Sequence, residues 1–282
     1  MELTLKPDLT GKVTVVTGGA GVLCKEFAKA LALCGAKVAI LNRTLSKAED
    51  VAAEIKAMGG EATAVAVDVT NAESVKAAHE QVLSIYGPCD ILINGAGGNN
   101  PRATTDQEYF DPAGLDDETK TFFDLDEEGM SFVFNLNFIG TLLPTQAFAK
   151  DMIGRPGCTI VNVSSMNAYT PLTKIPAYSG AKAAISNFTQ WLAVHFSHAG
   201  IRVNAIAPGF FSTEQNKKLL WNEDGTPTAR TGKILAATPM GRFGEPAELL
   251  GALMFLVDEK AASFVTGIVI PVDGGFSAYS GV

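Results

Sequence analysis

Three side chains near the middle of the chain could share one proton: the Ser165 hydroxyl, the Tyr178 phenol and the Lys182 ammonium. On a helix that begins near Pro176, Tyr178 and Lys182 are four residues apart and emerge from one face. A phenol with a pKa of about 10 needs its anion stabilised by roughly 3–4 kcal/mol to exchange a proton near pH 7. A cation about 4 Å away supplies ~4 kcal/mol at an effective dielectric constant of about 20. Tyr178 is therefore a candidate general acid or base for a carbonyl or alcohol held by Ser165, although a Tyr-x-x-x-Lys pair can also arise by chance on an exposed helix.

The elements that must position these side chains alternate between strand and helix. Apolar and β-branched runs predict strands at residues 12–17, 37–41, 62–67, 90–93, 159–163, 201–207 and 266–272. Capping residues and terminal glycines predict helices at residues 22–34, 46–58, 71–86 and 245–257, and one from about 176 onward. The alternation predicts a single α/β domain over residues 1–282, a doubly wound parallel sheet of the Rossmann type with helices on both faces. Ser165 then follows the carboxyl end of a strand, where such sheets bind ligands.

A glycine-rich turn follows the first expected strand. Gly18, Gly19 and Gly21 precede the next helix, so backbone N–H groups and the positive end of the helix dipole would face a pyrophosphate. The second strand ends at Asn42 and Arg43, where a carboxylate would select NAD. An amide and a guanidinium favour the 2′-phosphate of NADP(H) and leave NAD(H) possible. Alternatively, Arg43 stacks on the adenine or points into water.

Residues after the third and fourth strands complete this expected cofactor site. Asp68, followed by Val69, could accept a hydrogen bond from the adenine amino group. The turn Asn94-Gly-Ala-Gly97 consists largely of small residues, which let the backbone approach a cofactor closely.

With these motifs in place, the chain resembles the short-chain dehydrogenase/reductase family over nearly its whole length. The matching residues are Thr17-Gly18, Asp68, Asn94-Gly-Ala-Gly97, Asn137, Ser165, Tyr178-x-x-x-Lys182, Pro208-Gly209 and Thr213. The resemblance implies a homotetrameric oxidoreductase acting on CH–OH groups with NAD(P), with Asn137, Ser165, Tyr178 and Lys182 as its catalytic tetrad. It implies that Lys182 also binds the nicotinamide ribose. The full expected cofactor site is Gly18, Gly19, Gly21, Val22, Leu23, Asn42, Arg43, Asp68, Val69, Asn94, Gly95, Ala96, Gly97, Tyr178, Lys182, Pro208, Gly209, Phe211 and Thr213.

The glycine turn departs from the family pattern. Val22 and Cys24 stand at two positions where the family has glycine. Gly19 and Gly21 are expected to restore the turn.

Two segments bear on the substrate. Residues 98–129 form an insertion longer by roughly twenty residues than is usual in the family, and long loops in compact domains are more often functional than idle. Asn99, Asn100 and Arg102 offer groups suited to a polyhydroxy carboxylate, which would also contact Ser165 and Tyr178. Residues 210–233 are expected to form a mobile substrate flap.

Three stretches resemble the D-mannonate oxidoreductase (fructuronate reductase) branch of the family: residues 94–101, 208–216 and 271–281. This resemblance implies interconversion of D-fructuronate and D-mannonate. Two alternatives remain: a reductase of another substrate class, such as a keto-gluconate or a 3-oxoacyl thioester, and a non-catalytic dinucleotide-sensing protein. The substitutions at Val22 and Cys24 prompt the second alternative, and an intact tetrad argues against it.

The composition of the chain indicates which classes of partner it binds. A net charge of −8 and a pI near 5.0 argue against nucleic-acid and membrane partners and for a small-molecule substrate. The first residues lack a signal-peptide pattern, and four widely spaced cysteines indicate reduced thiols, so we expect a cytoplasmic protein. His195 and His198 have no nearby third ligand, so we expect no metal site.

Overall fold

A parallel β-sheet forms the centre of the computed structural model, which describes residues 1, 3–112, 118–212 and 220–281. Within these residues the sheet has seven strands in the order β3-β2-β1-β4-β5-β6-β7, and every neighbouring pair is parallel. The strands are β1 (Val13–Thr17), β2 (Lys37–Asn42), β3 (Glu61–Ala66), β4 (Ile91–Asn94), β5 (Thr159–Val163), β6 (Arg202–Pro208) and β7 (Val269–Val272). The chain order reverses between β1 and β4, where sheets of this class bind ligands.

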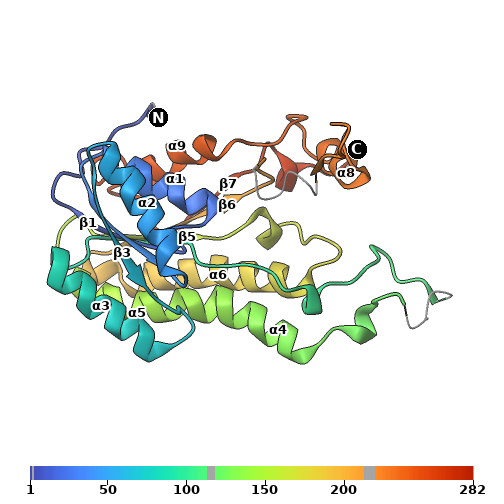
Figure 1. Ribbon diagram of the computed structural model, residues 1–282, viewed down its shortest axis with the longest axis horizontal. Helices are drawn as coiled ribbons and strands as arrows, with labels where there is room; N and C mark the ends of the chain where they lie inside the picture. Colours follow the sequence, from blue (N-terminus) through green and yellow to red (C-terminus); the bar gives the residue numbers. More distant parts are fainter. Residues whose placement is uncertain (2, 113–117, 213–219, 282) are drawn as a thin grey trace.

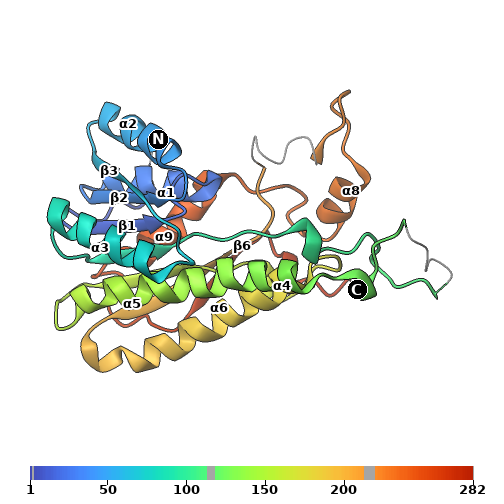
Figure 2. The same ribbon diagram turned by 60° about the horizontal axis from the view of Figure 1, so that its bottom comes forward.

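Helices cover both faces of the sheet (Figures 1 and 2). One layer consists of α1 (Val22–Leu33), α2 (Leu45–Ala57) and α9 (Leu250–Val257), which bury apolar side chains against the sheet. The other consists of α3 (Ala72–Tyr86), α5 (Gly140–Met152) and α6 (Pro176–His195). Covered on both sides, β1 and β4 are buried along their whole length, as continuous apolar parallel strands should be. The predicted single-domain, doubly wound fold is confirmed.

The remaining elements are short. Helices α4 (Glu127–Phe134) and α8 (Ala229–Ala236) lie at the same end of the molecule (Figures 1 and 2). A π-helix, η4 (Asn135–Ile139), joins α4 to α5. The 3₁₀ turns are η1 (Pro101–Ala103), η3 (Phe122–Asp124), η5 (Met166–Ala168), η6 (Ser197–Ala199), η7 (Pro246–Leu249) and η8 (Phe276–Ala278). None of the helices in the described part of the chain is long and apolar enough to cross a membrane.

Element boundaries differ from expectation at the end of the chain. Strand β7 begins at Val269, not at residue 266, because Thr266 Oγ1 accepts a 3.0 Å hydrogen bond from Val203 N and Gly267 adopts φ +80°. The expected helix over residues 245–257 begins as the 3₁₀ turn η7 and becomes α9 at Leu250. In the expected flap, α8 continues to Ala236, beyond residue 233.

Candidate active site

Strand β5 delivers two serines that have different environments. Ser164 Oγ lies 2.7 Å from Ser186 Oγ and donates a 3.1 Å hydrogen bond to the carbonyl oxygen of Lys182, so it ties β5 to α6. The Ser165 side chain instead hydrogen-bonds Tyr178. The structure thus separates a structural serine from the one that meets the phenol.

Helix α6 presents Tyr178 and Lys182 on one face, as their spacing predicts. The Lys182 ammonium is buried, lies 5.6 Å from the centroid of the Tyr178 ring, and donates a 2.8 Å hydrogen bond to Val163 O. Burial lowers the pKa of Lys182 to about 8, and the nearby Cys24 thiol acts in the opposite direction. Burial raises the pKa of Tyr178, whereas its hydrogen bond to Ser165 lowers it. At neutral pH the site therefore holds a protonated phenol beside a buried cation.

Asn137 lies on the π-helix and is fully buried. Its Nδ2 donates 2.8 Å hydrogen bonds to Gly98 O and Val133 O, and its Oδ1 accepts one from Gly98 N at 3.3 Å. A Cβ added to Gly97 would lie 2.6 Å from Asn137 Oδ1 and 3.1 Å from Lys182 Nζ, so the amide and the ammonium meet at this glycine. The structure therefore brings all four expected catalytic residues together. π-Helical turns are frequent at functional sites. No feature of the sequence predicted the one at Asn135–Ile139.

Two connected pockets run across the carboxyl ends of the strands. One, of about 490 Å³, lies over β1, β2, β3 and β4; the other, of about 330 Å³, lies between β1, β5 and β6 and is lined by Ser165, Tyr178 and Lys182. They share Gly18, Gly21, Gly95 and Gly97. Together they form an elongated cleft across the position where the strand order reverses, which is where a dinucleotide binds in such folds.

Most of the expected cofactor residues line this cleft. The first pocket includes Gly18, Gly21, Asn42, Arg43, Asp68, Val69, Gly95, Ala96 and Gly97. The second adds Val22, Leu23, Tyr178, Lys182, Pro208 and Gly209. Three expected residues do not line the cleft. Gly19 N donates a 3.2 Å hydrogen bond to Leu41 O, Asn94 is buried and hydrogen-bonded to Thr145 and Asn162, and Phe211 packs against Gly244. Thr213 lies outside the described residues.

The backbone around the glycine turn fits a pyrophosphate. Gly18 has φ +62°, and a Cβ there would lie 2.8 Å from Ala96 Cα. Thr17 Oγ1 accepts hydrogen bonds from Gly95 N (3.1 Å) and Ala96 N (3.2 Å), which holds the two turns together. Gly21 caps α1 without a side chain, so the first N–H groups of that helix face the cleft unobstructed.

Cys24 explains how the turn tolerates its departure from the family pattern. The buried thiol is 3.8 Å from Gly95 O and occupies the space that a Cβ on Gly95 would need. Burial raises the pKa of Cys24 to about 12, so it remains a neutral packing group. The side chain thus fills the gap between α1 and the Gly95 turn, and Gly18 keeps the turn's conformation.

At the adenosine end, the polar residues after β2 and β3 lie close together. Asn42 Nδ2 donates to Thr44 O at 3.0 Å, and Arg43 is exposed at the pocket edge. Asp68 accepts hydrogen bonds from Thr70 N (2.9 Å) and Thr70 Oγ1 (2.6 Å). These bonds lower the pKa of Asp68, and the Arg43 charge lowers it further.

The three expected substrate residues of the insertion have local partners. Asn99 lines the adenosine-side pocket, and the Asn100 side chain accepts a 2.9 Å hydrogen bond from Arg102 N. The Arg102 guanidinium pairs with Asp126 and Glu128, each at 2.9 Å. None of the three lines the pocket that contains Tyr178. Their contact with substrate stays a prediction, and the charge of Arg102 is already compensated.

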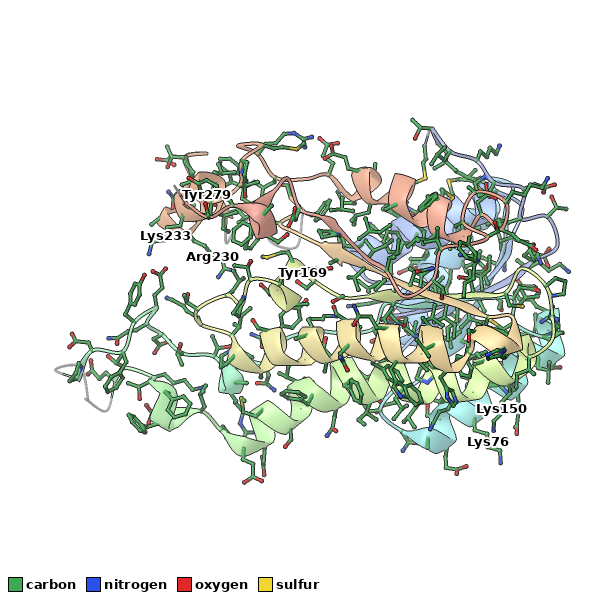
Figure 3. The ribbon with its side chains drawn as sticks, turned by 180° about the vertical axis from the view of Figure 1, so that it is seen from behind. Lys76, Lys150, Tyr169, Arg230, Lys233 and Tyr279 are labelled. Carbon is green, nitrogen blue, oxygen red and sulfur yellow. The ribbon has the colours of Figure 1, made fainter. Side chains whose placement is uncertain are left out.

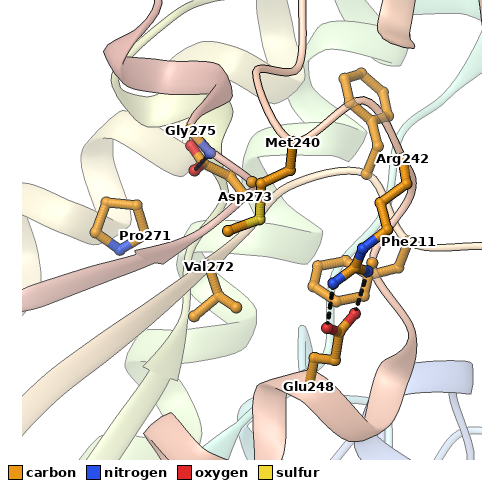
Figure 4. A pocket seen from close by; sticks show the side chains of 11 residues that line it. Phe211, Met240, Arg242, Glu248, Pro271, Val272, Asp273 and Gly275 are labelled. Atoms are coloured by element: carbon orange, nitrogen blue, oxygen red, sulfur yellow. Dashed lines mark hydrogen bonds and ion pairs between the residues drawn. The ribbon is translucent and has the colours of Figure 1, made fainter.

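Two further pockets border the site. One, of about 400 Å³ (Figure 4), contains an Arg242–Glu248 pair joined by hydrogen bonds of 2.6 and 2.7 Å, and no tetrad residue lines it. The other, of about 360 Å³, is lined by Lys174, Arg230 and Lys233. None of these three cations was predicted from the sequence to be a site residue. Two features of the sequence could have indicated them. Lys174 lies four residues before Tyr178, and Arg230 and Lys233 are three residues apart in the expected flap of an acidic chain.

A family model and three relatives relate this chain to known proteins. The family model "short chain dehydrogenase" matches residues 12–224. A Haemophilus influenzae structure described as a "putative D-Mannonate oxidoreductase" with bound NAD is 59% identical, covers 98% of both chains and superposes with a TM-score of 0.95. An uncharacterized oxidoreductase UxuB of Bacillus subtilis is 55% identical over 99% of this chain and 100% of its own. A 5-keto-D-gluconate 5-reductase of Escherichia coli K12 is 31% identical over 95% of this chain and 96% of its own.

Proposed function

Because this chain belongs to the short-chain dehydrogenase/reductase family, we propose that it interconverts the ketone and alcohol forms of a sugar acid, D-fructuronate and D-mannonate, with NAD(P)(H). The observation that carries the proposal is the meeting of Ser165, Tyr178 and Lys182 in a pocket continuous with a dinucleotide-shaped cleft. The names of the Haemophilus and Escherichia relatives, which refer to sugar acids, support this substrate class.

The residues divide the chemistry between them. A bound nicotinamide supplies or accepts the hydride. Ser165 Oγ donates a hydrogen bond to the substrate oxygen, and Tyr178 Oη gives that oxygen its proton during reduction. The Lys182 cation stabilises the phenolate left behind, and Asn137 fixes the Gly97–Gly98 backbone beside the ammonium. A raised pKa keeps Tyr178 protonated at neutral pH, which suits the reductive direction.

The substrate is tested by following nicotinamide absorbance with purified protein. We expect rapid oxidation of the reduced cofactor with D-fructuronate and slower oxidation with 5-keto-D-gluconate. Turnover of the gluconate alone, or of a 3-oxoacyl thioester alone, would replace the proposed substrate with that alternative. Cofactor binding without turnover of any carbonyl would favour the dinucleotide-sensing alternative.

We propose further that NADP(H) is favoured over NAD(H). The Haemophilus structure contains bound NAD. This supports the proposal that the cleft of this chain also accepts NAD(H). In this chain, Asn42 and Arg43 place an amide and a guanidinium at the ribose end of the pocket, with no carboxylate at the end of β2 to repel a 2′-phosphate.

Arg43→Ala should raise the KM for NADPH about tenfold and change the KM for NADH less than about threefold. The substitution removes an exposed charge-assisted hydrogen bond to the 2′-phosphate, which NADPH has and NADH lacks. Steady-state kinetics with both cofactors measures this. Lys56→Ala, at the other end of α2, removes an exposed cation and should leave the NADPH/NADH ratio unchanged. An unchanged ratio in Arg43→Ala would refute the role of Arg43.

We also propose that the protein forms the homotetramer that the family resemblance implies. Exposed Phe134 on α4 and exposed Trp191 and Val194 on α6 support it, because they leave apolar surface on the outer helices.

A further inference from the structure

The pocket of about 360 Å³ beside the catalytic pocket, called here the cationic pocket, is lined by more positive than negative side chains. Lys174, Arg230 and Lys233 line it together with one carboxylate, Glu108. Among the described lining residues this leaves an excess of two positive charges, in a chain whose net charge is −8. Such a reversal of local charge favours an anionic ligand.

The cationic pocket adjoins the reacting groups through two short stretches of chain. Ile175 lines it, and Ile175 O accepts a 3.1 Å hydrogen bond from Ser179 N in the first turn of α6, the turn that carries Tyr178. Phe210 also lines it and directly follows Gly209 of the catalytic pocket. The two pockets share no lining residue, but these two links make them neighbours along the chain.

The three cations differ in their partners. Lys233 Nζ pairs with Glu108 at 2.7 Å, which joins α8 to the insertion. Lys174 Nζ donates a 2.6 Å hydrogen bond to the backbone oxygen of Asp106, so its charge is oriented but not neutralised. Arg230 forms no ion pair with any residue the structure describes. Its planar guanidinium offers the paired donors that bind a carboxylate in bidentate fashion.

The rest of the pocket suits the carbon skeleton of a sugar acid. The rings of Phe210 and Phe276 meet edge to face with centroids 5.4 Å apart, and Ile234 of α8 also lines the cavity. Apolar walls with a few convergent charged groups are typical of small-molecule sites. The C–H faces of a polyhydroxy chain can pack on these walls while its anionic end meets the cations.

We propose that Arg230, assisted by Lys174 and Lys233, binds the substrate's carboxylate and so selects keto acids whose carboxylate lies at the opposite end of the carbon chain from the reacting ketone. This inference rests on the proposed function. Arg230 thus takes the role that the sequence predicted for Arg102.

Arg230→Ala should lower kcat/KM for D-fructuronate by about 10- to 100-fold, mainly through KM, because a hydrogen bond to a charged group contributes about 1.5–3 kcal/mol. Reduction of D-fructose, which has a hydroxymethyl group in place of the carboxylate, should change less than about twofold. Arg230→Lys keeps the charge and should recover part of the loss. The melting temperature should stay unchanged, because Arg230 has no ion-pair partner in the described structure.

The matched control is Lys150→Ala. Lys150 lies on α5 at the opposite end of the molecule from Arg230 and Lys233 (Figure 3), and its removal lowers the net charge equally. It should leave both substrates unaffected. A loss of activity equal for D-fructuronate and D-fructose in Arg230→Ala, or no loss for either, would overturn the carboxylate subsite.

Binding measurements separate the subsite from the proposed function. Calorimetric titration of the enzyme and its NADP⁺ complex with D-mannonate, D-gluconate and D-mannitol needs no turnover. If wild type turns over neither keto acid, yet Arg230→Ala weakens binding of either carboxylate at least tenfold relative to mannitol, the subsite stands and the proposed reaction fails. If turnover of D-fructuronate is found and Arg230→Ala leaves it intact, the reaction stands and the subsite fails.

Discussion

Replacing Tyr178 with phenylalanine should reduce the rate of ketone reduction by roughly 10²–10⁴-fold, the usual contribution of a positioned general acid. The substitution removes only Oη, so the ring still packs beside Lys182 and the cleft keeps its shape. The KM for the reduced cofactor should therefore change little, while kcat falls. Steady-state kinetics together with cofactor fluorescence titration would separate these effects.

Tyr169→Phe provides a matched control for this substitution. Tyr169 is exposed, and its Oη donates a 3.1 Å hydrogen bond to Val269 O, which is not part of the tetrad. Its loss should leave the rate of reduction within about twofold of wild type. Activity of Tyr178→Phe within about threefold of wild type would show that Tyr178 is not the proton donor, given the size of effect expected.

Lys182→Met should abolish most activity and at the same time stabilise the folded protein. A unit charge near the developing phenolate contributes up to ~4 kcal/mol, so its loss should lower kcat by at least roughly 10²-fold. Burying the ammonium lowers its pKa from 10.5 to about 8, and a shift of that size opposes folding by about 3 kcal/mol near pH 7. Methionine removes that penalty but leaves Val163 O without its donor, a loss of about 1 kcal/mol.

The stability difference between Lys182→Met and the wild-type protein should depend on pH. Between pH 8 and pH 10.5, the unfolded wild-type chain holds a proton on Lys182 that the folded protein has released, so wild-type stability from this group rises with pH. The stability advantage of Lys182→Met should be largest below pH 8 and shrink as the pH approaches 10.5. Denaturant unfolding of both proteins at pH 7 and pH 10 measures it. An advantage that grows with pH, or a variant less stable than wild type at pH 7, would contradict the assigned burial penalty.

Several features of this protein follow from local sequence alone. Tyr178 and Lys182 share a face because helical residues four apart always do. The strand at Val13–Thr17 and the turn at Gly18 were predictable because apolar β-branched runs form buried strands and only glycine readily adopts φ +62°. Motifs of this kind depend on neighbours within a few positions, so the fold class could be predicted from the sequence. The tetrad of Asn137, Ser165, Tyr178 and Lys182 was instead implied by the resemblance to the family.

Other features depend on residues far apart in the chain, and only the tertiary structure decided them. Cys24 fits at a glycine position because Gly95, 71 residues away, leaves room for its thiol. Asn137 reaches Gly98 because a π-turn, which has no local signature here, interrupts the helix.

The substrate end of the cleft depends on similar long-range contacts. From the sequence, Arg102 was the expected anion ligand, and no such role was predicted for Arg230. Folding pairs Arg102 with Asp126 and Glu128 and places Arg230 on α8 in a pocket beside the first turn of α6. The difference between a structural cation and a candidate substrate cation thus lies in contacts between distant segments, which spacing along the chain does not encode.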